Sequence, residues 1–311
     1  MELRAYRPGD EADLVACWNR ALPRDQVSLR RFIDTTLLDQ NFCEEGLIEA
    51  RDQGVLKGFV HAVAGPGASP SPGKEGWICA LAVEPGSRRR GVASELLTRA
   101  EAFLARRGCA RALVSPYPSG YYYPGVPLGR YPGSREVFER RGYRVQAMAV
   151  AMDLPLVDYE VPAEVSRWRG ELEGQGWRFG AISPPWYVPL IRLCESFSED
   201  WAATARAALR RDLDPRRIQV AVLGDALGGF AMFGGFDRSA DRFGPMGVHR
   251  DLRRSGLGTV LLHETLREMA SQALHVAWFL WTGEEDAAAR IYRRAGFQVT
   301  RRFAIYERAL G

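Results

Sequence analysis

Two short stretches combine arginines with glycines directly before an apolar helix pattern. "VEPGSRRRGVASELLTRAE" covers residues 83–101, and "VHRDLRRSGLGTVLLHETL" covers residues 248–266. The first N–H groups of a helix have no partner within it and carry about half a positive charge. Small residues let the backbone approach an anion, and arginines add charge-assisted hydrogen bonds. Each stretch therefore predicts an anion site that suits a pyrophosphate, although either one alone could equally be a plain turn with solvated arginines.

The best-known glycine motifs do not explain these turns. Gly256-Leu257-Gly258 is not followed by the third glycine of the dinucleotide fingerprint, and the chain contains no GxxxxGK[ST] phosphate loop. Another class of phosphate-binding turn is indicated.

The surroundings of the two turns repeat as well. Gly91 and Gly256 lie 165 positions apart, and each is preceded by a strand pattern and followed by a helix of about four turns, a strand and a short helix. The short helices end in a glycine and an aromatic residue, in "SREVFERRGY" and "DAAARIYRRAGF". We therefore expect two α/β (α+β) domains, each a mostly antiparallel mixed sheet flanked by helices.

The junction of the repeats is polar and marked by proline and glycine. "DLPLVDYEVPAEVSRWRGELEGQG" contains one helical segment, "AEVSRWRGELE". The expected division is an N-terminal domain over residues 1–155, a linker helix within 156–176 and a C-terminal domain over 177–311.

Composition excludes several classes of protein. The net charge is +4, with 42 Lys+Arg against 38 Asp+Glu, so a nucleic-acid partner is not indicated. The five cysteines are odd in number and form no CxxC pair, which favours a reducing compartment and predicts no metal site. There is no apolar run of membrane-spanning length and no signal-peptide core at the start, so we expect a cytoplasmic protein without a membrane partner.

The order strand, V-x-x-x-x-[RQ]-x-x-G-x-[GA], helix, strand, then a helix ending Y-x-x-x-G-F resembles the GNAT family of N-acetyltransferases. The resemblance covers nearly the whole chain, and the doubled arrangement is similar to that of tandem GNAT proteins, the mycothiol synthases among them, in architecture only. It implies that acetyl-CoA is the cofactor and that amides of the turn hold its pyrophosphate. The preceding strand would separate from its neighbour and pair with the pantetheine arm. The cofactor-binding residues so implied are Val83, Arg88, Arg90, Gly91, Val92, Ala93 and Ser94, and Met246, Val248, Arg253, Arg254, Gly256, Leu257, Gly258 and Thr259.

The resemblance also implies which copy is catalytic. In the family a tyrosine on the last short helix, four residues before its glycine, often protonates the departing thiolate. That residue is Tyr292 in the second copy but Phe138 in the first, and phenylalanine has no proton to give. The C-terminal domain is therefore expected to be catalytic and the N-terminal domain degenerate, although Tyr292 could merely pack. One departure from the family is Glu285, where many relatives carry asparagine.

Other candidates for acid–base chemistry are less distinct. Asp241, at the start of the strand before the second turn, is the expected general base, and Asp237 lies in the preceding loop. His249 is expected to be a turn residue, and His263 does not belong to an HExxH motif. For the oxyanion, the backbone over Met246–Val248 is a better candidate than any side chain.

The first copy carries an insertion, "SPYPSGYYYPGVPLGRYPGS" at residues 115–134, rich in tyrosine, glycine and proline. It could wall a substrate pocket, cover the interface between the domains, or supply a hydroxyl in place of Phe138. A structural or pocket-shaping role is favoured over catalysis.

These observations lead to two hypotheses. The first is an N-acetyltransferase that moves acetyl from acetyl-CoA to a primary amine of a small molecule or peptide in the C-terminal domain. The second is a non-catalytic protein that binds or senses acyl-CoA. In either case the protein is expected to be a monomer, as a pseudo-dimer of domains, or a homodimer.

Overall fold

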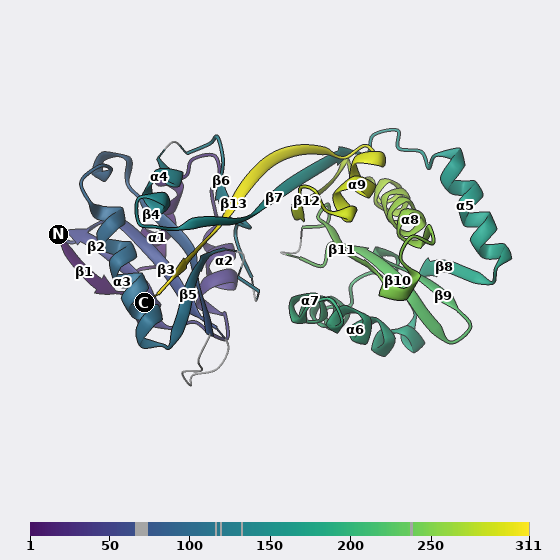
Figure 1. The fold of residues 1–311 in the computed structure, drawn as a ribbon, viewed down its shortest axis with the longest axis horizontal. Helices are drawn as coiled ribbons and strands as arrows, with labels where there is room; N and C mark the ends of the chain where they lie inside the picture. The colour runs from purple at the N-terminus through teal and green to yellow at the C-terminus, as the bar shows by residue number, and fades with distance from the viewer. Residues whose placement is uncertain (66–73, 116, 119, 132, 237–238, 311) are drawn as a thin grey trace. The chain divides into compact units, whose positions relative to one another are not determined.

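The computed structural model describes residues 1–65, 74–115, 117–118, 120–131, 133–236 and 239–310. The chain forms two compact units (Figure 1). Unit 1 contains Met1–Ala149 and the chain from Arg301 on, and unit 2 contains Val150–Thr300. Mixed α/β architecture with mainly antiparallel strands confirms the expected fold class.

In unit 1 the strand order is β1-β2-β3-β4-β5-β13-β7, with β6 also paired to β13. Strands β1 to β4 are antiparallel, β4 and β5 are parallel, and β13 is antiparallel to β5. The strands are β1 (Glu2–Ala5), β2 (Leu47–Asp52), β3 (Val55–Ala64), β4 (Lys74–Val83), β5 (Cys109–Val114), β6 (Val126–Pro127), β7 (Arg144–Pro155) and β13 (Gln298–Ala309).

Helices cover both faces of this sheet. On one face lies α3 (Val92–Arg106), whose apolar side chains are buried at three- and four-residue steps: Val92, Leu96, Leu97, Ala100, Phe103 and Leu104. A second core contains Leu14, Trp18 and Phe32 from α1 (Glu11–Ala21) and α2 (Leu29–Phe32), together with Phe59 of β3. The short α4 (Ser134–Glu139) precedes β7.

Unit 2 repeats this plan with one difference in the sheet. Strands β8 to β11 form an antiparallel sheet, whereas β12 pairs with β7. The strands are β8 (Trp177–Ala181), β9 (Ile218–Leu223), β10 (Ala226–Phe233), β11 (Phe243–Val248) and β12 (Val276–Gly283). The helices are α5 (Ala163–Gly174), α6 (Tyr187–Glu195), α7 (Glu199–Arg210), α8 (Leu257–Ser271) and α9 (Ala287–Arg294). The α8 side chains share one core with Ala221, Ala231 and Phe233, and α6 and α7 pack into another with Val220, Phe230 and Met232.

The structure divides the chain differently from the expected boundaries. The last strand, β13, begins in unit 2 but belongs to unit 1 from Arg301 on, so residues 177–311 are not one domain. Phe303 and Tyr306 of this strand are fully buried in unit 1. Helix α5 occupies the segment that we expected to form a linker, yet it packs within unit 2, where Val165 and Leu172 are buried beside α8. An apolar strand or helix buries equally well in either unit, so periodicity alone does not assign it.

No helix in the described part of the chain is long and apolar enough to cross a membrane. Over the same residues, no cluster of three or more His, Cys, Asp or Glu side chains has the arrangement of a metal site.

Candidate active site

The two arginine–glycine turns have the same backbone conformation. After the strand, each forms one 3-10 turn, Pro85–Ser87 or Arg250–Leu252, and then a residue with positive φ, +59° at Arg89 and +68° at Arg254. Each ends in a left-handed glycine that caps the helix, with φ +85° at Gly91 and +89° at Gly256. An added Cβ would find no atom closer than 3.9 Å at either glycine. Glycine is therefore favoured at both positions by the positive φ angle, and not by a lack of room for a side chain.

The start of each helix is open to a ligand. Neither capping glycine has a side chain that could bond the first amides of α3 or α8. In α8 the Leu257 amide lies 3.5 Å from the Ser255 hydroxyl and the Thr259 amide donates to the Gly256 carbonyl at 3.0 Å, which leaves the Gly258 amide for a ligand. Arg89, Arg90 and Gly91 are exposed just before α3. Arg253 and Arg254 are exposed just before α8. This arrangement fits the pyrophosphate of coenzyme A.

The equivalent arginines Arg88 and Arg253 have different contacts. The Arg88 guanidinium donates to the Val83 carbonyl at 3.1 Å and to the Ala21 carbonyl at 2.7 Å, so it connects the turn to α1. The Arg253 guanidinium instead lies 6.0 Å from the ring centre of Phe197. Arg88 has a structural function in unit 1, whereas Arg253 has no such backbone anchor among the bonds of the described residues.

In both units the strand before the turn separates from its parallel neighbour. In unit 1 the last residues paired between β4 and β5 are Ile78 and Val114, and β4 continues to Val83 with β3 as its partner on the other side. In unit 2 one bridge, Arg242 to Trp278, joins the chain entering β11 to β12. The Trp278 N–H also donates to the Asp241 carbonyl at 3.2 Å. Beyond these points an unpaired strand edge can bond an extended ligand such as a pantetheine arm.

A β-bulge lies at the point of separation in each unit. One extra residue stands on β4 between the partners of His61 and Ala62, and one on β11 between the partners of Ala231 and Phe233. Both bulges lie three to four residues before the valine that opens the turn. Bulges are frequent next to active sites because they redirect the strand. The bulge of unit 2 had one signal in the sequence, the Gly244-Pro245 pair within a strand.

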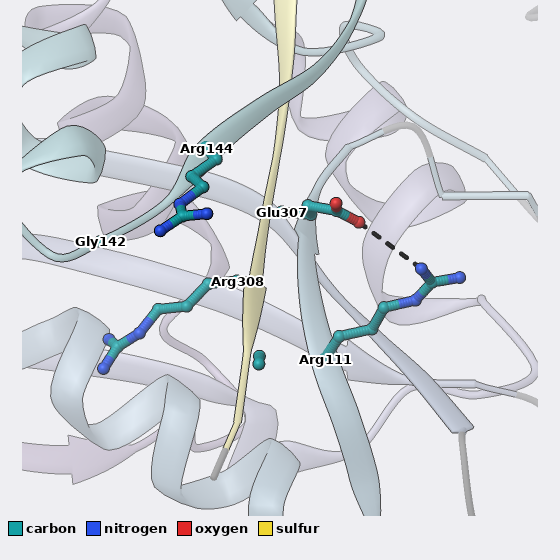
Figure 2. A pocket seen from close by; sticks show the side chains of 6 residues that line it. Arg111, Gly142, Arg144, Glu307 and Arg308 are labelled. Carbon is teal, nitrogen blue, oxygen red and sulfur yellow. Dashed lines mark hydrogen bonds and ion pairs between the residues drawn. The ribbon is translucent and has the colours of Figure 1, made fainter.

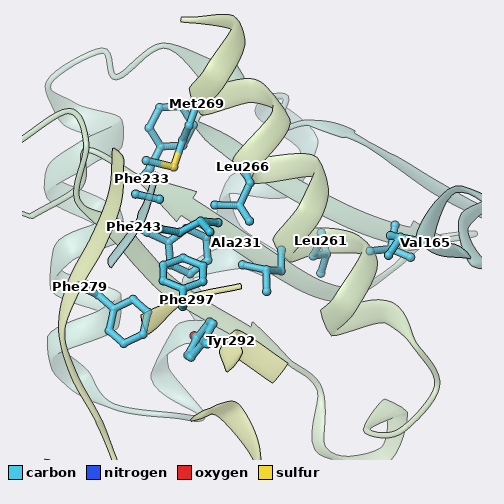
Figure 3. Close-up of a cluster of buried hydrophobic side chains, with 14 of the residues drawn as sticks. Val165, Ala231, Phe233, Phe243, Leu261, Leu266, Met269, Phe279, Tyr292 and Phe297 are labelled. Carbon is cyan, nitrogen blue, oxygen red and sulfur yellow. The ribbon is translucent and has the colours of Figure 1, made fainter. Parts of the chain in front are cut away.

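Tyr292 lies beside Phe243, Phe279 and Phe297 in the core of unit 2 (Figure 3). Its ring centre is 5.9 Å from that of Phe243, which follows Arg242, and 4.6 Å from that of Phe279, which follows Trp278. Phe297 completes the aromatic surroundings at 5.6 Å. Tyr292 is 8% exposed, and its burial raises the pKa of the hydroxyl, which therefore stays protonated at neutral pH. A protonated hydroxyl at this place can donate a proton to a ligand between the strands.

The matching position of unit 1 has no such group. Phe138 is buried against Tyr143 and Tyr306, at 5.4 and 6.0 Å between ring centres. The two neighbouring hydroxyls donate elsewhere, Tyr143 to Glu101 and Tyr306 to Glu139, both at 3.1 Å.

Tyrosines of the insertion at 115–134 are also engaged in hydrogen bonds within unit 1. The Tyr122 hydroxyl lies 2.8 Å from that of Thr36, Tyr117 donates to Asp39 at 2.9 Å, and Tyr131 donates to Asp25 at 2.5 Å. These contacts tie the insertion to the chain around α1 and α2. They support the structural role that we favoured; residues 116, 119 and 132 lie outside the described part.

The remaining acid–base candidates are placed as follows. The Asp241 carboxylate accepts a hydrogen bond from Ser239 at 2.6 Å, beside the bridge to β12. His249 accepts from the Asp251 amide in the turn. His263 is buried against Tyr159, its Nδ1 2.5 Å from the hydroxyl, and burial lowers the pKa of His263 to about 4. Asp237 lies outside the described residues.

A cavity of about 500 Å³ in unit 1 is lined by Arg111, Gly142, Arg144 and the end of β13 (Figure 2). The Arg111 guanidinium lies 3.5 Å from Glu307 there. Arg111 is near the beginning of β5, whereas β4 and β5 separate at the end of β5. The lining contains no residue of either turn, so this cavity is not the candidate site.

Comparison with known proteins agrees with this geometry. Residues 12–118 match the acetyltransferase (GNAT) family model and residues 214–299 match a GNAT acetyltransferase domain model, together more than half of the chain. The chain is 26% identical over 259 residues to a mycothiol acetyltransferase from Geodermatophilus obscurus, covering 78% of this chain and 76% of the relative.

Three solved structures share the fold across 99% or more of this chain. A GNAT acetyltransferase from Sphaerobacter thermophilus has a TM-score of 0.69 at 17% identity, with 95% of that chain covered. A tandem GNAT protein of clavulanic acid biosynthesis has a TM-score of 0.66 at 18% identity, with 98% covered. A glucosamine N-acetyltransferase region of a fungal multi-domain β-N-acetylglucosaminidase has a TM-score of 0.80 at 18% identity, and the present chain spans 38% of that protein.

The paired turns, the separating strands and both family matches lead to one conclusion: the chain belongs to the GNAT acetyltransferases, as a tandem N-acetyltransferase that uses acetyl-CoA.

Proposed function

We propose that acetyl transfer takes place in unit 2 and that the acceptor is a primary amine of a small molecule or peptide. The observation that carries the proposal is Tyr292, whose ring lies against Phe243 and Phe279 at the separation of β11 and β12. The equivalent Phe138 has no hydroxyl, so unit 1 lacks this donor.

Each residue has a defined task in this proposal. Amides of Gly256 to Thr259 and the Arg253 and Arg254 side chains bind the pyrophosphate, and the Met246–Val248 backbone donates to the thioester oxygen. When bound, acetyl-CoA supplies the acetyl thioester. Asp241 removes a proton from the acceptor ammonium, so that the free amine can attack the thioester carbonyl. Tyr292 donates its proton to the sulfur as the carbon–sulfur bond breaks.

Two relatives support the proposed acceptor class, and an assay over several amines tests it. The mycothiol acetyltransferase and the glucosamine N-acetyltransferase region named above suggest amines on small polar molecules. A panel of glucosamine, cysteine, spermidine and a short peptide, assayed by release of the CoA thiol, should identify at least one amine acetylated well above acetyl-CoA hydrolysis. Binding of acetyl-CoA without turnover of any amine would contradict the proposal.

Replacement of Tyr292 tests the assignment to unit 2. Tyr292→Phe should lower kcat more than about tenfold without weakening acetyl-CoA binding. Tyr159→Phe is a control because it removes another tyrosine hydroxyl of unit 2, a half-buried one that contacts His263. Equal kcat values for wild type and Tyr292→Phe would exclude Tyr292 as the donor.

A further inference from the structure

One residue of β11 lacks a side chain at a place where unit 1 has one. Gly247 pairs with Phe230 of β10, and the matching pair of unit 1 is Ala82 with Phe59. A Cβ added at Gly247 would lie 2.5 Å from Cε2 of Phe197, which is closer than Cβ atoms come to another atom in real structures. The glycine therefore leaves the space that the Phe197 ring fills.

Phe197 lies in the short connection between α6 and α7. Its amide donates to the Cys194 carbonyl at 2.9 Å, and the next residue, Ser198, caps α7 by accepting from the Trp201 amide at 3.2 Å. The Phe197 ring is half-buried, with its centre 5.0 Å from that of Trp201 and 6.0 Å from the Arg253 guanidinium. The ring is therefore fixed beside β11 and next to an arginine of the second turn.

Both faces of β11 are covered near Gly247. In the described chain β11 is the edge strand of the four-stranded sheet, and its backbone at Met246 to Val248 is the place proposed for the thioester. Met246 and Val248 pack into the core that contains Tyr292 and α8. Because side chains alternate along a strand, Gly247 faces the other side, where Phe197 packs with α6 and α7. An acyl group at this edge would be bounded by the first core on one face and by Phe197 on the other.

We infer that Phe197 limits the length of the acyl group that unit 2 accepts. Its ring occupies the space beside Gly247 that the further carbons of a longer acyl group need, so acetyl-CoA is preferred over butyryl-CoA. An apolar wall typically selects against an extra methylene group by about tenfold or more. The inference rests on the proposed reaction in unit 2, and it assigns the choice of acyl group to a residue outside the turn and the strands.

Calorimetric titration tests the inference without an acceptor amine. In the full chain, wild type should bind acetyl-CoA about tenfold more tightly than butyryl-CoA in unit 2, and Phe197→Ala should bring the two dissociation constants close to equality. Unit 1 is the same in both proteins, so a change in the ratio of the constants belongs to unit 2. Equal binding of the two thioesters by wild type, or an unchanged ratio in Phe197→Ala, would overturn the inference.

Phe179→Ala is the matched control for this titration. Phe179 is another half-buried phenylalanine of unit 2, and it lies on β8 at the edge of the sheet opposite β11. Its replacement removes the same number of atoms and should leave the ratio of the two dissociation constants as in wild type. An equal change of the ratio in both variants would show a general loss of packing and would also overturn the inference.

A second substitution can refill the space that Phe197→Ala opens. Gly247 is not among the residues with positive φ, so alanine fits its backbone conformation. The new methyl group would collide with the ring in wild type but has room in Phe197→Ala. The double variant with Phe197→Ala and Gly247→Ala should therefore regain a several-fold preference for acetyl-CoA. A double variant with the same ratio as Phe197→Ala would show that this space does not select the acyl group. If Phe197→Ala does not fold, Phe197→Leu removes the ring, keeps apolar volume and should change the ratio in the same direction by less.

Steady-state kinetics separate this inference from the proposed function. With the amine that gives the highest turnover in the panel, Phe197→Ala should raise kcat/KM for butyryl-CoA relative to acetyl-CoA about tenfold. If Tyr292→Phe lowers kcat but Phe197→Ala changes neither the titration nor this ratio, only the role of Phe197 is wrong. If Tyr292→Phe has no effect on kcat while Phe197→Ala equalises the two dissociation constants, the catalytic assignment fails and Phe197 still selects the bound acyl group.

Discussion

Units 1 and 2 share the backbone of the arginine–glycine turn but differ in the side chains that could do chemistry. The glycine caps have nearly equal φ angles, and both strand pairs separate beside a bulge. Phe138 and Tyr292 occupy matching places with different chemistry. The comparison teaches that a repeat can keep the backbone conformation of a turn while one substitution removes a hydroxyl from the side chains around it.

The largest expected effect distinguishes the two turns. Gly256→Glu forces a side chain into a conformation with φ +89° and places a negative charge at the start of α8, so acetyl-CoA affinity in unit 2 should fall roughly 100-fold. Calorimetric titration with acetyl-CoA measures both affinity and stoichiometry. Gly91→Glu is the control for unit 1 and should leave acetyl transfer intact. Loss of transfer in Gly91→Glu alone would reverse the assignment of the catalytic unit.

A second difference lies in the strand beside the bulge. His61 of β3 and Met232 of β10 occupy equivalent positions. Each lies three residues after a glycine that pairs with the valine at the start of the turn, and these glycines are Gly58 and Gly229. Both ring nitrogens of His61 are buried without a hydrogen-bond partner in the described structure. Burial lowers the pKa of His61 to about 4 from its usual 6.5.

The sign of this shift predicts acid sensitivity. Between these two pH values His61 binds a proton in the unfolded chain but not in the folded one. The stability linked to neutral His61 is therefore fully present above pH 6.5 and is lost as the pH falls toward 4. His61→Met should reduce the loss of unfolding free energy between about pH 7.5 and about pH 5 by about 2 kcal/mol. Urea unfolding at both pH values measures it, with His263 unchanged in the two proteins. An identical pH dependence would show that His61 is hydrated or bonded in solution.

A smaller effect is expected from restoring the missing hydroxyl. Phe138→Tyr places an oxygen in an apolar core whose neighbouring hydroxyls already bond Glu101 and Glu139. Stability should fall by about 1–2 kcal/mol, and acetyl transfer should not rise. Thermal unfolding and the amine assay give the two readouts, and Phe138→Leu controls for lost packing. A gain in transfer would show that unit 1 lacks nothing but the donor.

The smallest expected effect concerns the matching arginines. Arg253→Ala should raise the KM for acetyl-CoA several-fold, because the side chain is free to bind phosphate. Arg88→Ala should change acetyl-CoA binding little and lower the melting temperature, since Arg88 bonds the Val83 and Ala21 carbonyls. Steady-state kinetics and thermal unfolding of the two variants provide the test. Equal effects of both changes on KM would mean that both turns bind cofactor in the same way.

Local patterns predicted much of the fold and of the site. The spacing of Leu96, Leu97 and Phe103 is that of an amphipathic helix with one buried face, and all three side chains are buried. Glycine at positions 91 and 256 predicted turns, and both have positive φ. The placement of Tyr292 beside two strands was not predictable, because Phe243 and Phe279 lie far from it in the sequence and meet it only in the folded core.

The sequence by itself determined the repeat, the two helix-capping turns and the absence of a hydroxyl at position 138, because each depends on residue type and short-range spacing. Only the tertiary structure decided that β13 belongs to unit 1 from Arg301 on and that α5 packs within unit 2. It also decided which tyrosine hydroxyls of the 115–134 insertion form hydrogen bonds. Arg301 shows the physical reason. The sequence does not indicate the partner of an arginine in a strand. Folding brings Arg301 against the buried carboxylate of Asp25, 276 positions away, and only this contact defines its partner.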